Sequence, residues 1–305
     1  MSEKIVSLLP SATEIVCALG LEDRLVGRSH ECDFPPTVQS LPACTAARFA
    51  TDGTSREIDT HVNELVASAL SLYSVDAERL ARLSPDLIVT QSQCEVCAVS
   101  LSDVRTAVSE CLGTEAEVVS LDAVDLNGIL EDIRAVAEAA GVGSRADSVI
   151  DGLRERVDRI RADVQGRPRP RVLAVEWLDP PMSAGNWVPD LIEAAGGECL
   201  HACPGEHSGR LGWDEVEALD PDVIVLMPCG FDMKRTREEL RALESGGAWN
   251  GLRAVREGAV FVTDGNQYFN RPGPRIVDSI EILREIIHPD SGPAPRFRDS
   301  GWSPV

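Results

Sequence analysis

Short apolar runs alternate with segments of helical periodicity along most of the chain. The runs are rich in Val, Ile and Leu, and they are predicted strands at residues 5–9, 25–28, 87–90, 118–121, 172–175, 223–227 and 260–263. Segments with helical patterns lie between most of them. This alternation predicts α/β units built around mostly parallel sheets.

One phrase occurs twice in the chain. Residues 83–90 read LSPDLIVT and residues 219–226 read LDPDVIVL, each after an acidic helical stretch. Each copy is typical of a helix, a Pro-Asp turn and a buried strand. Such turns are common in α/β proteins, but the long helical segment between the two copies favours two similar lobes over one large sheet.

The middle of the chain is helical in pattern from residue 126 to residue 164, with one break at residues 141–143. Its second part repeats apolar residues every three to four positions and ends at the Pro-rich stretch QGRPRPR. We therefore predict an N-terminal α/β lobe at residues 1–125, a linking helical region at 126–166, a C-terminal α/β lobe at 167–290 and a weakly structured Pro- and Gly-rich tail at 291–305.

Composition and charge disfavour several classes of partner. The 305 residues carry a formal net charge of −21, whereas a nucleic-acid-binding face needs clustered Lys and Arg. No apolar run approaches the roughly 20 residues that a membrane-spanning helix needs. No signal peptide is recognised before the first predicted strand. We therefore expect a cytoplasmic protein, or a periplasmic or other extracytoplasmic one if a leader has been removed.

The first helix is predicted to start at a Ser-x-x-Glu capping box, formed by Ser11 and Glu14, and to stop at Gly20. The loop LLPSAT then lies at the carboxyl end of the first strand, where ligands bind in open α/β sheets. Two further loops, GRSHECDFPP and TQSQCEVCAVS, follow strands of the same lobe. We expect all three loops to meet at one sheet edge.

Four potential metal ligands lie on these loops. Cys94-x-x-Cys97 is typical of a zinc or iron–sulfur site or of a redox dithiol, and His30-x-Cys32 supplies a possible second pair of ligands. The alternative is a thiol-lined pocket or small buried residues, because free Cys packs as a small hydrophobe. The odd total of nine cysteines favours reduced thiols over a disulfide framework.

Aromatic residues gather in the loops of the second lobe, although only 4% of the chain is aromatic. Trp187, Trp213, Tyr268 and Phe269 favour a flat hydrophobic ligand surface, and core packing of each ring is the alternative. A helix is predicted to start at about Gly273, with its N-terminus open to an anionic or amide group. Cys229 follows the second copy of the repeated strand and is a further candidate for the same site.

Three segments resemble the class III periplasmic solute-binding proteins, and specifically their cobalamin-binding branch: KIVSLLPSATEIVCALGLEDRLVGRSHECDFPP, LARLSPDLIVTQ and YFNRPGPRI. The resemblance implies two Rossmann-like α/β lobes joined by one long rigid helix, here at residues 146–164, with a corrinoid in the cleft between the lobes. It also implies that Glu78 and Asp214 dock onto an ABC permease. The family's aromatic position before F-x-R-x-x-P-R falls on Tyr268, and Phe269 and Arg271 follow it.

We therefore predict a binding protein, not an enzyme, for a cobalamin-type corrinoid, acting as an ABC-transporter substrate-binding protein or as a cytosolic carrier. Two alternatives stay open: binding of zinc, iron, heme or an iron chelate by the Cys/His cluster, and thiol-dependent processing of a corrinoid. An imidazole or a thiolate can also ligate cobalt, so the Cys/His cluster is compatible with corrinoid binding as well. The predicted ligand-binding residues are Ser11, His30, Glu31, Cys32, Gln91, Cys94, Cys97, Trp187, Trp213, Cys229, Tyr268, Phe269 and Arg271.

Overall fold

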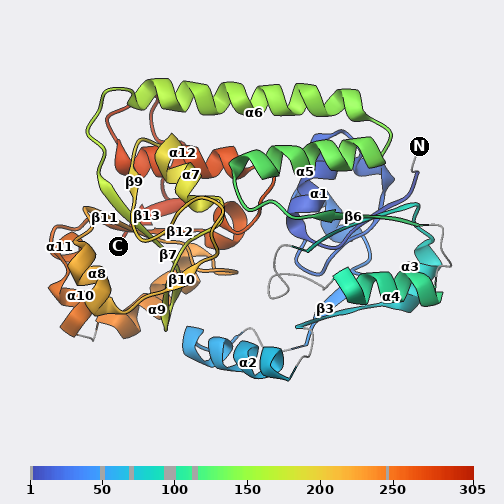
Figure 1. Ribbon diagram of the computed structural model, residues 1–305, viewed down its shortest axis with the longest axis horizontal. Helices are drawn as coiled ribbons and strands as arrows, with labels where there is room; N and C mark the ends of the chain where they lie inside the picture. Colours follow the sequence, from blue (N-terminus) through green and yellow to red (C-terminus); the bar gives the residue numbers. More distant parts are fainter. Residues whose placement is uncertain (1–2, 49–51, 69–71, 93–100, 112–115, 245–246) are drawn as a thin grey trace. The chain divides into compact units, whose positions relative to one another are not determined.

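The structure is a computed structural model that describes residues 3–48, 52–68, 72–92, 101–111, 116–244 and 247–305 (Figure 1). The chain divides into two compact units. Unit 1 consists of the residues up to Gly53, Glu57–Ala123 and Asn127–Gly152, and unit 2 consists of Thr54–Arg56, Val124–Leu126 and Leu153–Val305. Each unit has its own sheet and its own buried apolar cluster. The predicted two-lobe α/β fold is therefore confirmed.

The described residues of unit 1 form a parallel sheet of four strands in the order β2-β1-β5-β6. Val6, Leu8 and Ile88 are fully buried on one face of this sheet. The strands are β1 (Ile5–Ser7), β2 (Leu25–Gly27), β5 (Leu87–Gln91) and β6 (Glu117–Leu121), and β3 (Thr45–Ala47) and β4 (Tyr73–Val75) form a separate antiparallel pair. The helices in this part of the chain are α1 (Pro10–Ala18), α2 (Ser55–Ala67), α3 (Ala77–Leu83), α4 (Leu101–Cys111) and α5 (Leu126–Ala139), with 3₁₀ turns at Glu22–Arg24 and Pro36–Ser40.

Unit 2 is built on a mixed sheet of seven strands among its described residues, in the order β10-β8-β7-β11-β12-β13, with β9 also paired to β7. The core strands β7, β11 and β12 are parallel, whereas β8, β10 and β13 are antiparallel to their neighbours. The strands are β7 (Arg171–Leu178), β8 (Pro181–Ser183), β9 (Glu198–Cys199), β10 (Gly209–Arg210), β11 (Val223–Leu226), β12 (Val260–Thr263) and β13 (Trp302–Pro304). The helices are α7 (Val188–Ala194), α8 (Trp213–Leu219), α9 (Met233–Glu244), α10 (Gly247–Gly251), α11 (Arg253–Arg256) and α12 (Ile276–Ile287), with a π-helical turn at Gly265–Phe269.

The predicted long helix is α6 (Gly143–Val164), which begins three residues before the expected position and runs without a break (Figure 1). Its buried stripe consists of Ala146, Ile150, Leu153, Val157, Ile160 and Val164, at the spacing of one helical face. Its first ten residues belong to unit 1 and the rest to unit 2. No helix of the described residues is both long and apolar enough to cross a membrane.

The repeated phrase forms the same structural device in each unit. A helix ends in a left-handed residue, Ser84 after α3 and Asp220 after α8, and the Pro-Asp turn follows. Asp86 Oδ2 accepts the backbone N–H of Lys4 at 3.0 Å, and Asp222 Oδ2 accepts that of Arg171 at 2.8 Å. The aspartate thus fixes the start of the neighbouring strand, β1 or β7, and these N–H bonds hold the pKa of each carboxyl below its usual range.

The predicted capping box of the first helix is wrong. The helix begins at Pro10, Leu9 is its N-cap, and no side chain caps it. Proline fits the first helical position because its ring fixes φ and its missing N–H needs no partner there. Ser11 and Glu14 therefore lie inside the first turns and are buried, whereas Gly20 ends the helix with a φ of +68°, as predicted.

The helix predicted to start near Gly273 also starts later than expected, at Ile276. Pro272 and Pro274 bracket that glycine, and a residue that precedes proline is disfavoured in helical conformation. Arg275 is consequently the N-cap of α12, and Tyr268 and Phe269 lie in the π-helical turn that precedes it.

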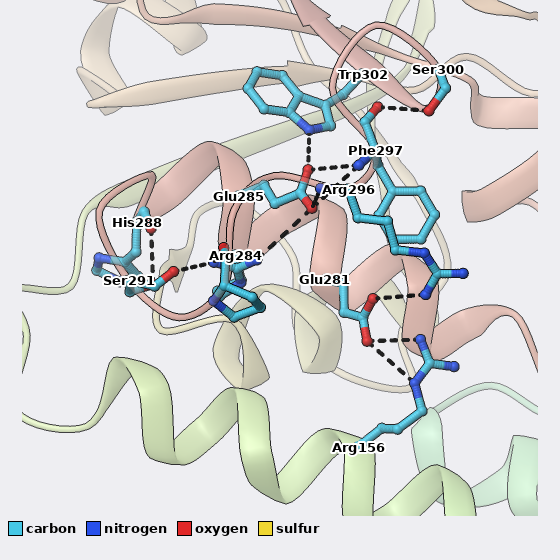
Figure 2. Close-up of polar contacts among 11 residues, drawn as sticks. Arg156, Glu281, Arg284, Glu285, His288, Ser291, Arg296, Phe297, Ser300 and Trp302 are labelled. Carbon is cyan, nitrogen blue, oxygen red and sulfur yellow. Dashed lines mark hydrogen bonds and ion pairs between the residues drawn. The ribbon is translucent and has the colours of Figure 1, made fainter.

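The prediction of a weakly structured tail is wrong. Strand β13 pairs with β12 from Phe261 to Thr263, and Phe297 and Trp302 are 5% and 4% exposed. The buried Glu285 of α12 accepts hydrogen bonds from this segment (Figure 2). Pro- and Gly-rich composition indicates the absence of regular local structure, but it does not reveal a partner that is distant in sequence.

Candidate functional site

The carboxyl ends of the parallel strands of unit 1 carry several of the predicted ligand-binding residues. Ser11 follows β1, His30, Glu31 and Cys32 follow β2, and Gln91 is the last residue of β5. Because parallel strands end at one edge, these positions share one side of the sheet. Cys94 and Cys97 lie outside the described residues.

A chain of hydrogen bonds joins the start of α1 to the loop after β2. Thr13 Oγ1 lies 3.0 Å from Cys32 Sγ and 2.8 Å from Ser7 Oγ, and Ser7 Oγ donates to Leu9 O at 2.9 Å. The hydroxyl of Thr13 has one proton, so it can donate to only one of its two neighbours. The Ser7 proton is used in the bond to Leu9, so the contact between Thr13 and Ser7 needs the Thr13 proton. The contact between Thr13 and Cys32 then needs the S–H proton of Cys32.

Cys32 is therefore a poor candidate for a metal ligand or a nucleophile. Its side chain is 1% exposed, and the hydrogen-bond chain needs the protonated thiol, whereas metals bind the thiolate. No group of three or more His, Cys, Asp or Glu residues in the described ranges is placed to hold a metal ion. The proposed cluster of His30, Cys32, Cys94 and Cys97 stays a prediction because half of it lies outside these ranges.

His30 has the chemistry of a ligand to a metal centre. Its Nδ1 lies 2.7 Å from Thr45 Oγ1, and its ring packs at 5.6 Å from that of Tyr73. Burial, and then the charge of Arg28, lower the pKa of His30, so its imidazole is neutral near pH 7. Nε2 makes no hydrogen bond to the described residues. In the tautomer that carries its proton on Nδ1, the ring donates to Thr45 and keeps a lone pair at Nε2, which is the usual arrangement of a metal-binding histidine.

The aromatic residues of unit 2 pack against other side chains of the same unit. Trp187 is 7% exposed and its Nε1 donates to the carbonyl of Phe269, which is itself 1% exposed. Trp213 makes an edge-to-face contact with Trp249 at 5.0 Å, and Tyr268 makes one with Phe297 at 5.5 Å. This favours the core-packing alternative for Trp187 and Phe269.

Polar residues lie at the carboxyl ends of β11 and β12. Asn270 Nδ2 lies 3.0 Å from Cys229 Sγ, and the buried Arg271 donates from Nη2 to Asn266 Oδ1 at 3.3 Å. A hollow of about 350 Å³ is lined by Gly230, Asp232, Lys234, Arg235, Glu238 and Asn266. Sequence reasoning missed this hollow. The available signal was the charged segment DMKRTREE, which follows the predicted strand 223–227 after the four residues PCGF.

The two predicted docking carboxylates occupy equivalent positions. Glu78 lies in the first turn of α3 and Asp214 in the first turn of α8, each on the helix that precedes the repeated Pro-Asp turn. Both are exposed, and the side chain of Glu78 is 90% exposed with only a 3.7 Å contact to Arg82. Such weakly paired surface carboxylates are available to a basic partner.

The chain matches the family model described as periplasmic binding protein over residues 5–267. The chain belongs to the periplasmic binding protein family. The resemblance stated from the sequence is thereby confirmed. Since the members of this family are solute-binding proteins, the prediction of a binding protein and not an enzyme is confirmed as well.

Individual members of the family are distant relatives. The uncharacterized ABC transporter substrate-binding lipoprotein YvrC of Bacillus subtilis (strain 168) is 24% identical and spans 95% of this chain and 81% of the relative. The vitamin B12-binding protein of Vibrio cholerae serotype O1 (strain ATCC 39541) is 22% identical and spans 92% and 87%. A solved periplasmic heme binding protein from Pseudomonas aeruginosa matches with a TM-score of 0.72 at 21% identity, covering 100% of this chain and 98% of that one. This structural likeness shows the shared fold.

Proposed function

We propose that this protein binds a cobalamin-type corrinoid and presents it to an ABC permease. The observation that carries the proposal is the neutral imidazole of His30, anchored at Nδ1 by Thr45 and without a hydrogen bond at Nε2 among the described residues. Cobalt in a corrinoid accepts such a nitrogen as an axial ligand. Similarity to a vitamin B12-binding protein over 92% of the chain supports a corrinoid as the ligand.

Titration with hydroxocobalamin tests this proposal. We expect a complex with a dissociation constant in the micromolar range or below, and a shift of the visible absorption bands when an imidazole replaces the cobalt-bound water. His30→Ala should abolish the shift, whereas His61→Ala, a change at an exposed position of α2, should preserve it. Absence of binding at micromolar concentrations would rule out the proposal.

Heme is the second candidate ligand. The P. aeruginosa protein of the same fold is named for heme binding, and a neutral imidazole also ligates heme iron. A competition experiment with hemin and hydroxocobalamin separates the two candidates. We expect hydroxocobalamin to displace hemin, and the reverse order of affinity would favour heme.

Docking to a permease is a separate part of the proposal. The family resemblance implies that Glu78 and Asp214 meet arginine side chains of the permease, and both are exposed at equivalent places in the two units. Glu78→Gln combined with Asp214→Asn should weaken binding to permease in proteoliposomes and leave corrinoid binding unchanged. Glu155→Gln, at an exposed position of α6, is the control. Equal permease binding by the double variant and the control would contradict docking through these two carboxylates.

Two predictions from the sequence remain to be tested by direct measurement. Elemental analysis of the anaerobically purified protein tests the zinc or iron cluster of His30, Cys32, Cys94 and Cys97. We expect the metal content per chain to be the same in the parent protein and in Cys32→Ala. Fractionation of the source cells tests the location of the protein. A permease partner requires an extracytoplasmic location.

A further inference from the structure

His30 lies in a loop of unit 1 that contains no helix or strand. The loop runs from Arg28, directly after β2, to the 3₁₀ turn at Pro36–Ser40. Its backbone is anchored at the first end, where Arg28 N donates to Pro42 O at 3.0 Å and Arg28 O accepts the N–H of Cys44 at 2.7 Å. A side chain binds a metal well only when its own position is fixed. The contacts that fix this loop therefore decide how well His30 can act as a ligand.

The side chain of Arg28 ties the two ends of this loop together. Its Nη1 donates to the carbonyl of Ser29 at 2.8 Å and to that of His30 at 3.3 Å. Its Nη2 donates to the carbonyl of Gln39 at 3.1 Å. A planar guanidinium presents its N–H donors in a fixed fork. One side chain thus fixes the carbonyl of His30 relative to the far end of the loop.

Arg28 differs from the paired arginines of the surface. Its side chain is partly buried, and it forms no ion pair with a carboxylate of the described residues. Its Nε is buried and has no hydrogen-bond partner in the same part of the chain. A buried donor without a partner lowers stability, and no ion pair offsets that loss here. What the guanidinium contributes is its set of bonds to the carbonyls of the loop.

Arg28 also completes the contacts that hold His30. Thr45 Oγ1 accepts the backbone N–H of His30 at 3.1 Å and lies 2.7 Å from Nδ1 of the ring. The ring packs against that of Tyr73, and Arg28 binds the carbonyl of the same residue. Every polar group of His30 except Nε2 therefore has a partner among the described residues of unit 1.

From these contacts we infer that Arg28 is a positioning residue for corrinoid binding, which holds His30 in the geometry that its Nε2 needs to ligate cobalt. The inference rests on the proposed function. Arg28 acts through the backbone of His30 and is not itself a ligand to the metal. Loss of a contact one step removed from a metal typically weakens metal binding by about 10- to 100-fold.

The test titrates hydroxocobalamin into four proteins: the parent, Arg28→Ala, His30→Ala and the combination of both changes. Arg28→Ala should bind about tenfold or more weakly than the parent, and a smaller fraction of the bound corrinoid should show the shifted visible bands. In the His30→Ala background, the same change should alter the affinity by less than about twofold, because a residue that acts through His30 has no effect without it.

Arg145→Ala is the matched control. Arg145 Nη1 also donates to two successive carbonyls, those of Leu19 at 2.9 Å and Gly20 at 3.1 Å, but at the end of α1. Its loss should leave the affinity and the band shift at the parent values. Arg28→Lys is the milder second variant, for use if Arg28→Ala does not fold. An ammonium keeps the charge but lacks the planar fork, so we expect a loss of about threefold or more that again depends on His30.

Parental affinity in either variant of Arg28 would overturn the inference and leave the proposed function intact. An equal loss with and without the His30 imidazole would also overturn it, because Arg28 would then only support the fold. A loss of the same size in Arg145→Ala would have the same meaning. Failure of the parent protein to bind hydroxocobalamin would instead refute the proposed function on which the inference rests.

Discussion

The buried carboxylate of Glu285 holds the C-terminal segment of the chain against α12. It is 1% exposed, and it accepts hydrogen bonds from Arg296 N and Trp302 Nε1, each at 2.6 Å, and from Phe297 N at 3.1 Å (Figure 2). The guanidinium of Arg284, which is 3% exposed, lies 3.8 Å from the same carboxylate. One side chain thus satisfies three N–H donors and faces a buried positive charge.

Replacement of Glu285 by alanine should destabilise unit 2 by about 3–5 kcal/mol, the usual loss when one partner of a buried charged pair is removed. The three N–H donors would lose their acceptor, and each buried donor without a partner costs about 1–3 kcal/mol when it cannot reach water. The Arg284 side chain also donates to the carbonyls of Ser291 and Pro293, which keeps its charge in place. For a unit of this size, the melting temperature should fall by roughly 10 °C.

Urea denaturation followed by circular dichroism measures this loss, and hydrogen exchange of the 296–302 amides locates it. Glu285→Gln retains one acceptor oxygen and should lose less, about 1–3 kcal/mol. Glu281→Ala is the matched control on the same helix, because Glu281 is 22% exposed in its pairs with Arg156 and Arg296 and should cost about 1 kcal/mol or less. A loss below about 1 kcal/mol for Glu285→Ala, with unchanged exchange, would refute this reasoning.

Three further predictions concern single side chains. Burial raises the pKa of Asp132 to about 6, whereas its value in the unfolded chain is about 4, so folding favours the protonated acid. The unfolding free energy of the parent relative to Asp132→Asn should therefore fall by up to about 3 kcal/mol as the pH rises from 4 to 7, and a difference that does not change with pH would contradict this. Asp86→Ala and Asp222→Ala should each cost about 1 kcal/mol in urea denaturation, because each removes the acceptor for a strand-entry N–H, and a loss in only one of the two would contradict their equivalence. Cys32→Ser should unfold at nearly the parent urea concentration because a hydroxyl can donate to Thr13, whereas Cys32→Ala should cost about 1 kcal/mol, and equal stability of both variants would argue against the hydrogen-bond chain.

The parallel strands and the long helix were predictable because their signals are local. Runs such as Val223–Leu226 are buried on both faces of a sheet, so nearly every residue must be apolar. The stripe from Ile150 to Val164 follows from the helical period. The repeated Pro-Asp phrase was visible as a repeat, but the hydrogen bonds from Asp86 and Asp222 to distant strands were not, since they depend on pairing along the sheet.

The remaining errors have physical causes. Ser11 and Glu14 match the capping pattern, but Pro10 one residue earlier is already the first residue of the helix. The short antiparallel strands such as β10 (Gly209–Arg210) have too few residues to show alternation. Trp187 and Phe269 lie in or beside turns by sequence, yet burial depends on what folds over a turn. The hollow at Lys234 was missed because exposed charges on a helix carry no periodic signal.

Strand β13 also determines where the sheet of unit 2 stops. Without it, β12 would present unpaired backbone N–H and C=O groups along its open side, a template on which strands of other molecules can add. With it, the outermost strand is three residues long and contains Pro304, which cannot donate a hydrogen bond. A chain shortened before Trp302 should therefore self-associate, even if the rest of unit 2 remains folded.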